Sequence, residues 1–199
     1  MIPLYNAFKQ ISNLIRYSNL DDLDSQDKTT NNSGDYVKKL DLITNNIIIY
    51  NIKQIFDIRG YISEESDDII FTNKHGKYIL AFDPLDGSTN INSNISIGSI
   101  YGGYHWDEKT KKIGNIVNAG YCLYGPSTIL VNTDNESVNM YTLDENNHFK
   151  FTSNITLDNK DKLIYSINHS NSFNNKHFSE LLNYYKQNNL HEKYDIEEV

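Results

Sequence analysis

The densest group of candidate functional residues is the octapeptide Asp83–Asn90, which directly follows the apolar run Tyr78–Phe82. Two carboxylates, Asp83 and Asp86, lie three residues apart around Pro84. A tight turn here can bring both side chains and a backbone carbonyl to one point. Mg²⁺ prefers carboxylates, carbonyls and water as ligands, so the spacing favours a metal site. The simpler alternative is a polar turn capped by its own aspartates.

Other acidic residues precede this segment. Glu64 and Glu65 stand at the end of a predicted strand, where both side chains can turn toward one site although neighbours within a strand point apart. Asp35 lies where a helix is expected to begin and suits a cap. Asp41 falls well inside that predicted helix beside its apolar stripe, where an acid is unfavourable unless paired or liganded. The alternatives are solvated glutamates and a salt bridge from Asp41 to Lys38.

The elements that must position these residues follow from the spacing of apolar side chains. Helical spacing predicts helices over 3–17 and 35–56, separated by a polar loop over 18–34. Short β-rich runs predict strands at 59–63, 69–72, 78–82, 95–106, 119–123, 128–131, 138–143, 149–151 and 163–167. A helical stripe returns near 178–185. This order predicts an α+β fold, with two N-terminal helices packed on a mostly antiparallel sheet and a C-terminal helix.

Length and composition favour a single domain and argue against several classes of protein. The 199 residues suit a single domain over 1–199, with 191–199 as a flexible tail. A net charge of −8 argues against nucleic acid as a partner, and no apolar run is long enough to span a membrane. The single cysteine, Cys122, excludes a disulfide within the chain and a cysteine-based zinc site. We therefore expect a soluble, cytoplasmic protein.

Several separated blocks resemble a known family when they are taken together. The order Asp41, Glu64-Glu65 and 83–88 resembles the signature of the lithium-sensitive, Mg²⁺-dependent phosphomonoesterase superfamily. The stretches GDYVKKLD (34–41), GKYILAFDPLDGSTNI (76–91) and NAGYCLYGPSTILV (118–131) resemble the N-terminal, metal-binding half of class I fructose-1,6-bisphosphatases. The resemblance covers roughly residues 4–170 and implies a layered fold of the sugar-phosphatase type.

The resemblance also implies roles for individual residues. Glu64, Asp83, Asp86 and the backbone carbonyl of Leu85 would bind Mg²⁺, two or three ions per site with Mn²⁺ as a substitute, and Asp35 would bind or orient an additional ion. Asp41 and Glu65 would activate the attacking water, with Ser88 near that water or the phosphate. Substrate contacts would come from Gly87, Ser88, Thr89, Asn90 and Asn168. The implied reaction is Mg²⁺-dependent hydrolysis of a sugar bisphosphate, fructose 1,6-bisphosphate first among them, in gluconeogenesis.

Members of that family continue into a second domain that carries most sugar 6-phosphate contacts and a further metal-binding glutamate. Three alternatives follow. The chain is part of a fructose-1,6-bisphosphatase that works as a homo-oligomer or with a chain supplying the C-terminal domain. It is a relaxed-specificity phosphomonoesterase of the inositol monophosphatase type. Or it is a non-catalytic relative that binds metal or a partner.

Overall fold

The computed structural model describes residues 2–18, 26–30, 36–133 and 136–156, together with a few positions between 177 and 184. The chain divides into two compact units, Met1–Ile155 and Thr156–Val199. In the second unit, the described residues His177, Glu180, Leu181, Asn183 and Tyr184 have helical backbone, where a C-terminal helix is expected. The predicted strand 163–167 and the tail 191–199 lie outside the described residues, and the single domain stays a prediction.

Two α-helices lie among the described residues of the first unit. Helix α1 (Ile2–Tyr17) agrees with the expected helix, and Leu4, Phe8 and Ile11 are fully buried on its apolar face. Helix α3 (Lys39–Ile52) is shorter than predicted, because strand β2 (Tyr36–Lys38) occupies the positions before it. Asp41 therefore lies in the first turn of α3, and the prediction that it stands well inside the helix is wrong.

The segment predicted as a loop over 18–34 contains a strand. Strand β1 (Gln26–Thr30) pairs antiparallel with β2 in a two-stranded sheet. Backbone hydrogen bonds alone can form such a ladder, so it does not require an alternation of apolar residues. The strand was not predicted, because the segment is polar and has no alternation of apolar residues.

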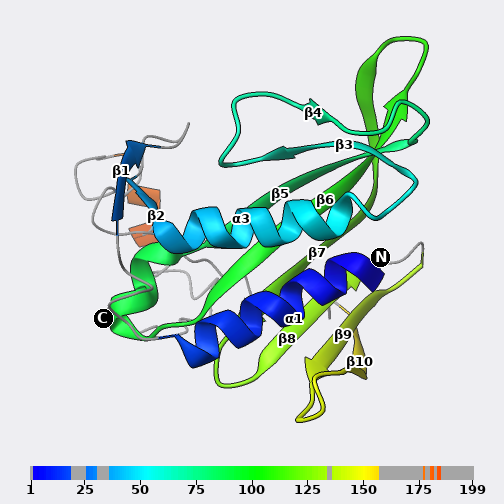
Figure 1. Ribbon diagram of the computed structural model, residues 1–199. Helices are drawn as coiled ribbons and strands as arrows, with labels where there is room; N and C mark the ends of the chain where they lie inside the picture. Colours follow the sequence, from blue (N-terminus) through cyan, green and yellow to red (C-terminus); the bar gives the residue numbers. More distant parts are fainter. Residues whose placement is uncertain are drawn as a thin grey trace. The chain divides into compact units, whose positions relative to one another are not determined.

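The second sheet has eight strands, in the order β10-β9-β8-β7-β6-β5-β3-β4. The strands are β3 (Ile58–Ser63), β4 (Ile70–Phe71), β5 (Tyr78–Asp86), β6 (Ile97–Asp107), β7 (Lys112–Tyr124), β8 (Thr128–Thr133), β9 (Val138–Leu143) and β10 (Phe149–Ile155). Every neighbouring pair is antiparallel except β3 and β5, which are parallel. The structure confirms the predicted α+β class, and Figure 1 shows both helices along the sheet.

The helices cover one face of this sheet. The ring of Phe8 in α1 lies 5.8 Å from the ring of Tyr101 in β6, and Leu80 and Phe82 of β5 belong to the same buried core. The opposite face carries large apolar side chains that remain exposed, among them Ile100 at 47% and its cross-strand neighbour Tyr121 at 41%. The core of the first unit therefore lies between the sheet and the two helices.

The parallel pair β3 and β5 has a direct consequence for the acidic residues. Ser63, the last residue of β3, is in register with Phe82 of β5. In parallel strands the carboxyl ends lie at the same edge of the sheet, which is where side chains gather to form sites in such folds. Glu64 and Asp83, the next residues along each strand, are thereby brought side by side.

Candidate functional site

Glu64, the first residue after β3, lies beside Asp83 of β5, where the parallel pairing of the two strands ends. The Glu64 N–H donates a hydrogen bond of 3.0 Å to the Phe82 carbonyl, which continues the parallel ladder. Burial, with smaller contributions from the neighbouring charges of Glu64 and Asp86, raises the pKa of the Asp83 carboxyl to about 7 against an opposing hydrogen bond from the Leu85 N–H. Three of the four predicted metal ligands thus share one electrostatic environment with the fourth, Leu85, beside them.

The Asp83–Asp86 segment is the irregular last part of strand β5. Its pairing with β6 shifts register between Asp83 and Asp86, as in a β-bulge. Within it the Leu85 N–H donates to Asp83 Oδ1 at 2.9 Å. Gly87 then adopts a left-handed conformation with φ of 77°, which glycine reaches without steric cost, and the short 3₁₀ helix η1 (Ser88–Ser93) begins. The tight turn predicted at Asp83–Asp86 is therefore wrong: these residues belong to strand β5, and the chain turns only at Gly87.

Asp41, Glu65 and Ser88 come together beside this turn. Asp41 is buried, with 6% of its surface exposed, and the Ser88 hydroxyl donates to Asp41 Oδ2 at 3.5 Å. Burial raises the pKa of Glu65 to about 7, with further contributions from the charges of Asp41 and Glu64. The three residues predicted to act on water or phosphate are therefore neighbours, although they come from three separate segments.

We call the five carboxylates Asp41, Glu64, Glu65, Asp83 and Asp86 the carboxylate cluster. It borders a cavity of about 460 Å³ on the sheet face opposite the helices, lined in part by Glu64, Asp83 and Ile100. Two further cavities, of about 470 and 600 Å³, are lined by none of the predicted site residues.

Of the other residues predicted to bind substrate or metal, the structure describes only some. The exposed Thr89 and the half-buried Asn90 lie in η1, where the Asn90 N–H donates to the Gly87 carbonyl at 2.8 Å. Asp35 and Asn168 lie outside the described residues. The roles of all these residues stay predictions.

Four polar residues that hold the site in place, three of them buried, were not predicted from the sequence. Ser63 donates from its hydroxyl to Asn45 Oδ1 at 2.8 Å and accepts from the Glu65 N–H at 3.2 Å, which ties the two glutamates to α3. The Ser99 hydroxyl donates to the Pro84 carbonyl and is hydrogen-bonded to Tyr124, which holds the Asp83–Asp86 segment from the core side of the sheet. A polar residue on the apolar face of a predicted strand, such as Ser99, was the signal available in the sequence.

The residue types of the carboxylate cluster fit a hard divalent cation, because such an ion prefers carboxylate oxygens and because like charges lie close together around Asp83 and Glu65. Among the described residues, however, no three His, Cys, Asp or Glu side chains are gathered closely enough to hold a metal ion. The cluster is therefore an acidic neighbourhood and not a closed coordination shell.

The fold and the site define an α+β domain with an acidic, oxygen-rich site where the parallel pairing of two strands ends. Residues 1–154 match the family model described as "Fructose-1-6-bisphosphatase, N-terminal domain", so the chain belongs to the fructose-1,6-bisphosphatase family. The family resemblance seen in the sequence is confirmed.

Individual relatives give the same result. The chain is 36% identical over 179 residues to fructose-1,6-bisphosphatase class 1 of Shewanella pealeana, covering 86% of this chain and 54% of that protein. It is 36% identical over 195 residues to fructose-1,6-bisphosphatase 1 of Mus musculus, covering 92% and 57%. The crystal structure of Leishmania major fructose-1,6-bisphosphatase in holo form is similar with a TM-score of 0.84 at 31% identity, covering 94% of this chain and 63% of that one.

The chain thus spans about half the length of the curated relatives it matches. Among the described residues, no helix is both long and apolar enough to cross a membrane.

Proposed function

We propose that this chain is the metal-binding part of a phosphoric monoester hydrolase that converts fructose 1,6-bisphosphate to fructose 6-phosphate and phosphate. The observation that carries the proposal is the position of Glu64 beside Asp83 where the parallel pairing of β3 and β5 ends, with the other carboxylates around them. Family membership supports the choice of substrate, because the matched relatives are named fructose-1,6-bisphosphatases.

The family is generally metal-dependent, and we propose Mg²⁺, with Mn²⁺ as a substitute, as the ion of this site. Glu64, Asp83, Asp86 and the Leu85 carbonyl would hold two or three ions, with Asp35 as a further ligand. Bound Mg²⁺ would neutralise phosphate charge, lower the pKa of a water molecule and stabilise the leaving oxygen. Without such cations, the net charge of −8 and the local cluster would repel a phosphorylated substrate.

The chain's own residues would orient the reactants and accept a proton. Glu65 and Asp41 lie close enough to influence each other's charge, so together they form a proton acceptor at the edge of the cluster. The Ser88 hydroxyl, which donates to Asp41, would fix that carboxylate in place and lie near the water or the phosphate. Gly87, Thr89, Asn90 and Asn168 would contact the substrate.

The proposal includes a partner chain. We propose a cytoplasmic protein that works as a homo-oligomer or with a chain that supplies a C-terminal part. Remote contacts from such a part would supply binding energy that orients the reacting phosphate.

The test is Mg²⁺-dependent phosphate release from fructose 1,6-bisphosphate by the purified chain, compared with Asp86→Ala and with Asp67→Ala. Both aspartates are exposed, so neither change should unfold the protein, and only Asp86 belongs to the cluster. We expect release that needs Mg²⁺, is abolished in Asp86→Ala and persists in Asp67→Ala. Full activity of Asp86→Ala would contradict the site assignment.

A folded chain that binds Mg²⁺ but releases no phosphate would instead support the alternative in which the missing part is required. Adding a C-terminal segment of a relative in trans would then be expected to restore turnover. Hydrolysis of a simple aryl phosphate at a rate equal to that of fructose 1,6-bisphosphate would favour the relaxed-specificity alternative.

A further inference from the structure

Ser99 and Tyr124 form a buried polar pair on the face of the sheet that packs against the helices. Ser99 of β6 is 0% exposed and Tyr124 of β7 is 5% exposed, and their hydroxyl oxygens lie 2.8 Å apart. Tyr124 is in register with Ile97, two residues before Ser99, so the two side chains are diagonal neighbours on one face. Burying hydroxyl groups in an apolar core costs free energy unless each is hydrogen-bonded.

The direction of the hydrogen bonds follows from the protons available. Ser99 has one hydroxyl proton and donates it to the Pro84 carbonyl at 2.7 Å. The Ser99–Tyr124 hydrogen bond then needs Tyr124 as its donor, and the Tyr124 hydroxyl also has a hydrogen-bonding interaction with the buried Cys122 thiol. Burial raises the pKa of the Tyr124 hydroxyl well above its ordinary value, so this group keeps its proton at neutral pH. The hydrogen bonds run from Tyr124 through Ser99 to the Pro84 carbonyl.

The accepting carbonyl lies in the irregular last part of strand β5, between Asp83 and Asp86. The pairing of β5 with β6 shifts register between Asp83 and Asp86, which disrupts the regular strand hydrogen bonds at this point. Pro84 is fully buried, and a buried backbone carbonyl needs a hydrogen-bond donor. The Ser99 hydroxyl supplies that donor from the neighbouring strand.

The Pro84 carbonyl and the Leu85 N–H belong to one planar peptide unit. Ser99 holds the carbonyl of this unit, and its N–H donates to Asp83 Oδ1 at 2.9 Å. Fixing the carbonyl therefore also fixes the direction of the N–H, which orients the Asp83 carboxylate. It sets the start of the next peptide unit as well, which contains the Leu85 carbonyl.

We propose that Ser99 and Tyr124 are positioning residues that act through the Pro84–Leu85 peptide to orient the Asp83 carboxylate and the Leu85 carbonyl toward a divalent cation. This inference deepens the proposed function and rests on it. Neither side chain is a ligand, since both lie within the core on the helix side of the sheet.

The experiment measures Mn²⁺ binding to the full chain by electron paramagnetic resonance of the free ion. Mn²⁺ accepts the same oxygen ligands as Mg²⁺ and is visible by this method. The variants are Ser99→Ala, Ser99→Thr and Tyr124→Phe. Ser12→Ala is the matched control, because the Ser12 hydroxyl is also buried and bonds a hydroxyl, Thr128 Oγ1, at 2.6 Å.

We expect Ser99→Ala to weaken Mn²⁺ binding by about 10- to 100-fold, the effect typical of residues that support metal ligands. Tyr124→Phe should weaken it less, because Ser99 still reaches Pro84, and Ser99→Thr should restore binding by restoring the hydroxyl. Ser12→Ala should lower the unfolding midpoint about as much as Ser99→Ala and leave Mn²⁺ binding unchanged.

Several outcomes would overturn the inference. One is unchanged Mn²⁺ affinity in folded Ser99→Ala, and another is an equal loss of affinity in Ser12→Ala. If Ser99→Ala does not fold, Tyr124→Phe decides: faster hydrogen exchange of the Leu85 amide with weaker Mn²⁺ binding supports the inference, and no change in either overturns it.

A wild-type chain that binds no Mn²⁺ would refute the proposed function separately. Exchange of the Leu85 amide would still decide whether Ser99 orders this segment of β5: acceleration in Ser99→Ala but not in Ser12→Ala supports positioning, and equal exchange in all variants refutes it.

Discussion

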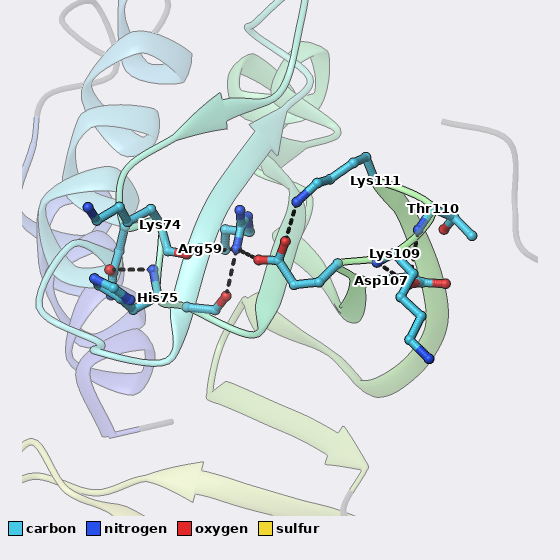
Figure 2. A network of polar contacts seen from close by, with 10 residues as sticks. Arg59, Lys74, His75, Asp107, Lys109, Thr110 and Lys111 are labelled. Carbon is cyan, nitrogen blue, oxygen red and sulfur yellow. Dashed lines mark hydrogen bonds and ion pairs between the residues drawn. The ribbon is translucent and has the colours of Figure 1, made fainter.

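The charged side chains at the two ends of β3 have opposite surroundings: those near its start are paired with the opposite charge, and those beyond its end lie beside like charges. Near its start, Arg59 donates to the Lys74 carbonyl at 2.8 Å and pairs with Glu108, which also pairs with Lys111 (Figure 2). The Arg59 guanidinium also lies 5.3 Å from the centre of the Trp106 ring. We call Arg59, Phe71, Trp106, Glu108 and Lys111 the arginine network. Just beyond the other end of the strand, the carboxylate cluster gathers charges of one sign.

The consequences for the pKa values differ accordingly. In the arginine network, the hydrogen bond from Lys111 lowers the pKa of Glu108, with help from the charge of Arg59. In the carboxylate cluster, burial and like charges raise the pKa values of Asp83 and Glu65 to about 7. Paired charges of opposite sign stabilise a fold, whereas like charges that crowd together at the end of a strand are typical of a site that binds a cation.

The largest effect expected from this difference is on metal affinity. Asp83→Asn keeps the acceptor for the Leu85 N–H but removes one charge, so we expect divalent metal affinity to fall by more than about 100-fold. The same change should raise the unfolding free energy of the metal-free chain at pH 8, because repulsion is relieved. Calorimetric titration and urea unfolding measure the two quantities.

Asp144→Asn is the matched control for that change. Asp144 accepts from the His148 N–H at 2.7 Å, and this bond holds the pKa of its carboxyl below the ordinary value. The control should therefore lower stability and leave metal affinity unchanged. Equal stability changes at Asp83 and Asp144 would contradict the proposed contrast.

The second prediction concerns pH. The pKa values of Asp83 and Glu65 are about 7 in the folded chain, and ordinary carboxyls titrate near 4. Between these values the folded state binds more protons than the unfolded state, so its stability falls as pH rises and levels off above 7. Because water screens these half-buried groups, we expect a loss of about 2 kcal/mol from pH 5 to 8.

Urea unfolding in EDTA at several pH values would measure this slope. Saturating Mg²⁺ should reduce it, because a cation favours the ionised carboxylates. Stability that rises steadily from pH 5 to 8 in EDTA would show that the cluster is not crowded as described.

The third prediction addresses the arginine network. Arg59→Met keeps much of the side-chain packing but removes the hydrogen bond to the Lys74 carbonyl and the stacking on the rings. We expect a loss of about 2 kcal/mol in unfolding free energy, with little from the exposed Glu108. Metal affinity should stay within experimental error of wild type. A large loss of affinity would show that the two ends of β3 are coupled.

The smallest effect is expected at Lys111. This side chain is 65% exposed and pairs with Glu108 three residues before it. Exposed pairs of this kind contribute little to stability, so Lys111→Met should leave the thermal midpoint and metal affinity unchanged. A clear drop in the midpoint would mean that the arginine network depends on Lys111 as well as on Arg59.

The sequence by itself determined the elements whose signals are local. The apolar stripe of α1 and most strands of the large sheet follow from side-chain spacing. The acidic residues around Asp83 were also recognisable, because their types and order are unusual in any turn. Where the sequence was wrong, at β1 and at the first turn of α3, backbone pairing between β1 and β2 outweighed the side-chain pattern.

Only the tertiary structure decided how those residues meet. Glu64 and Asp83 are neighbours because β3 and β5 are parallel and in a particular register, although 19 residue positions separate them in the sequence. Ser99 and Tyr124 support the end of β5 from two other strands. Strand register depends on the packing of the whole sheet against α1 and α3, so no local pattern contains it.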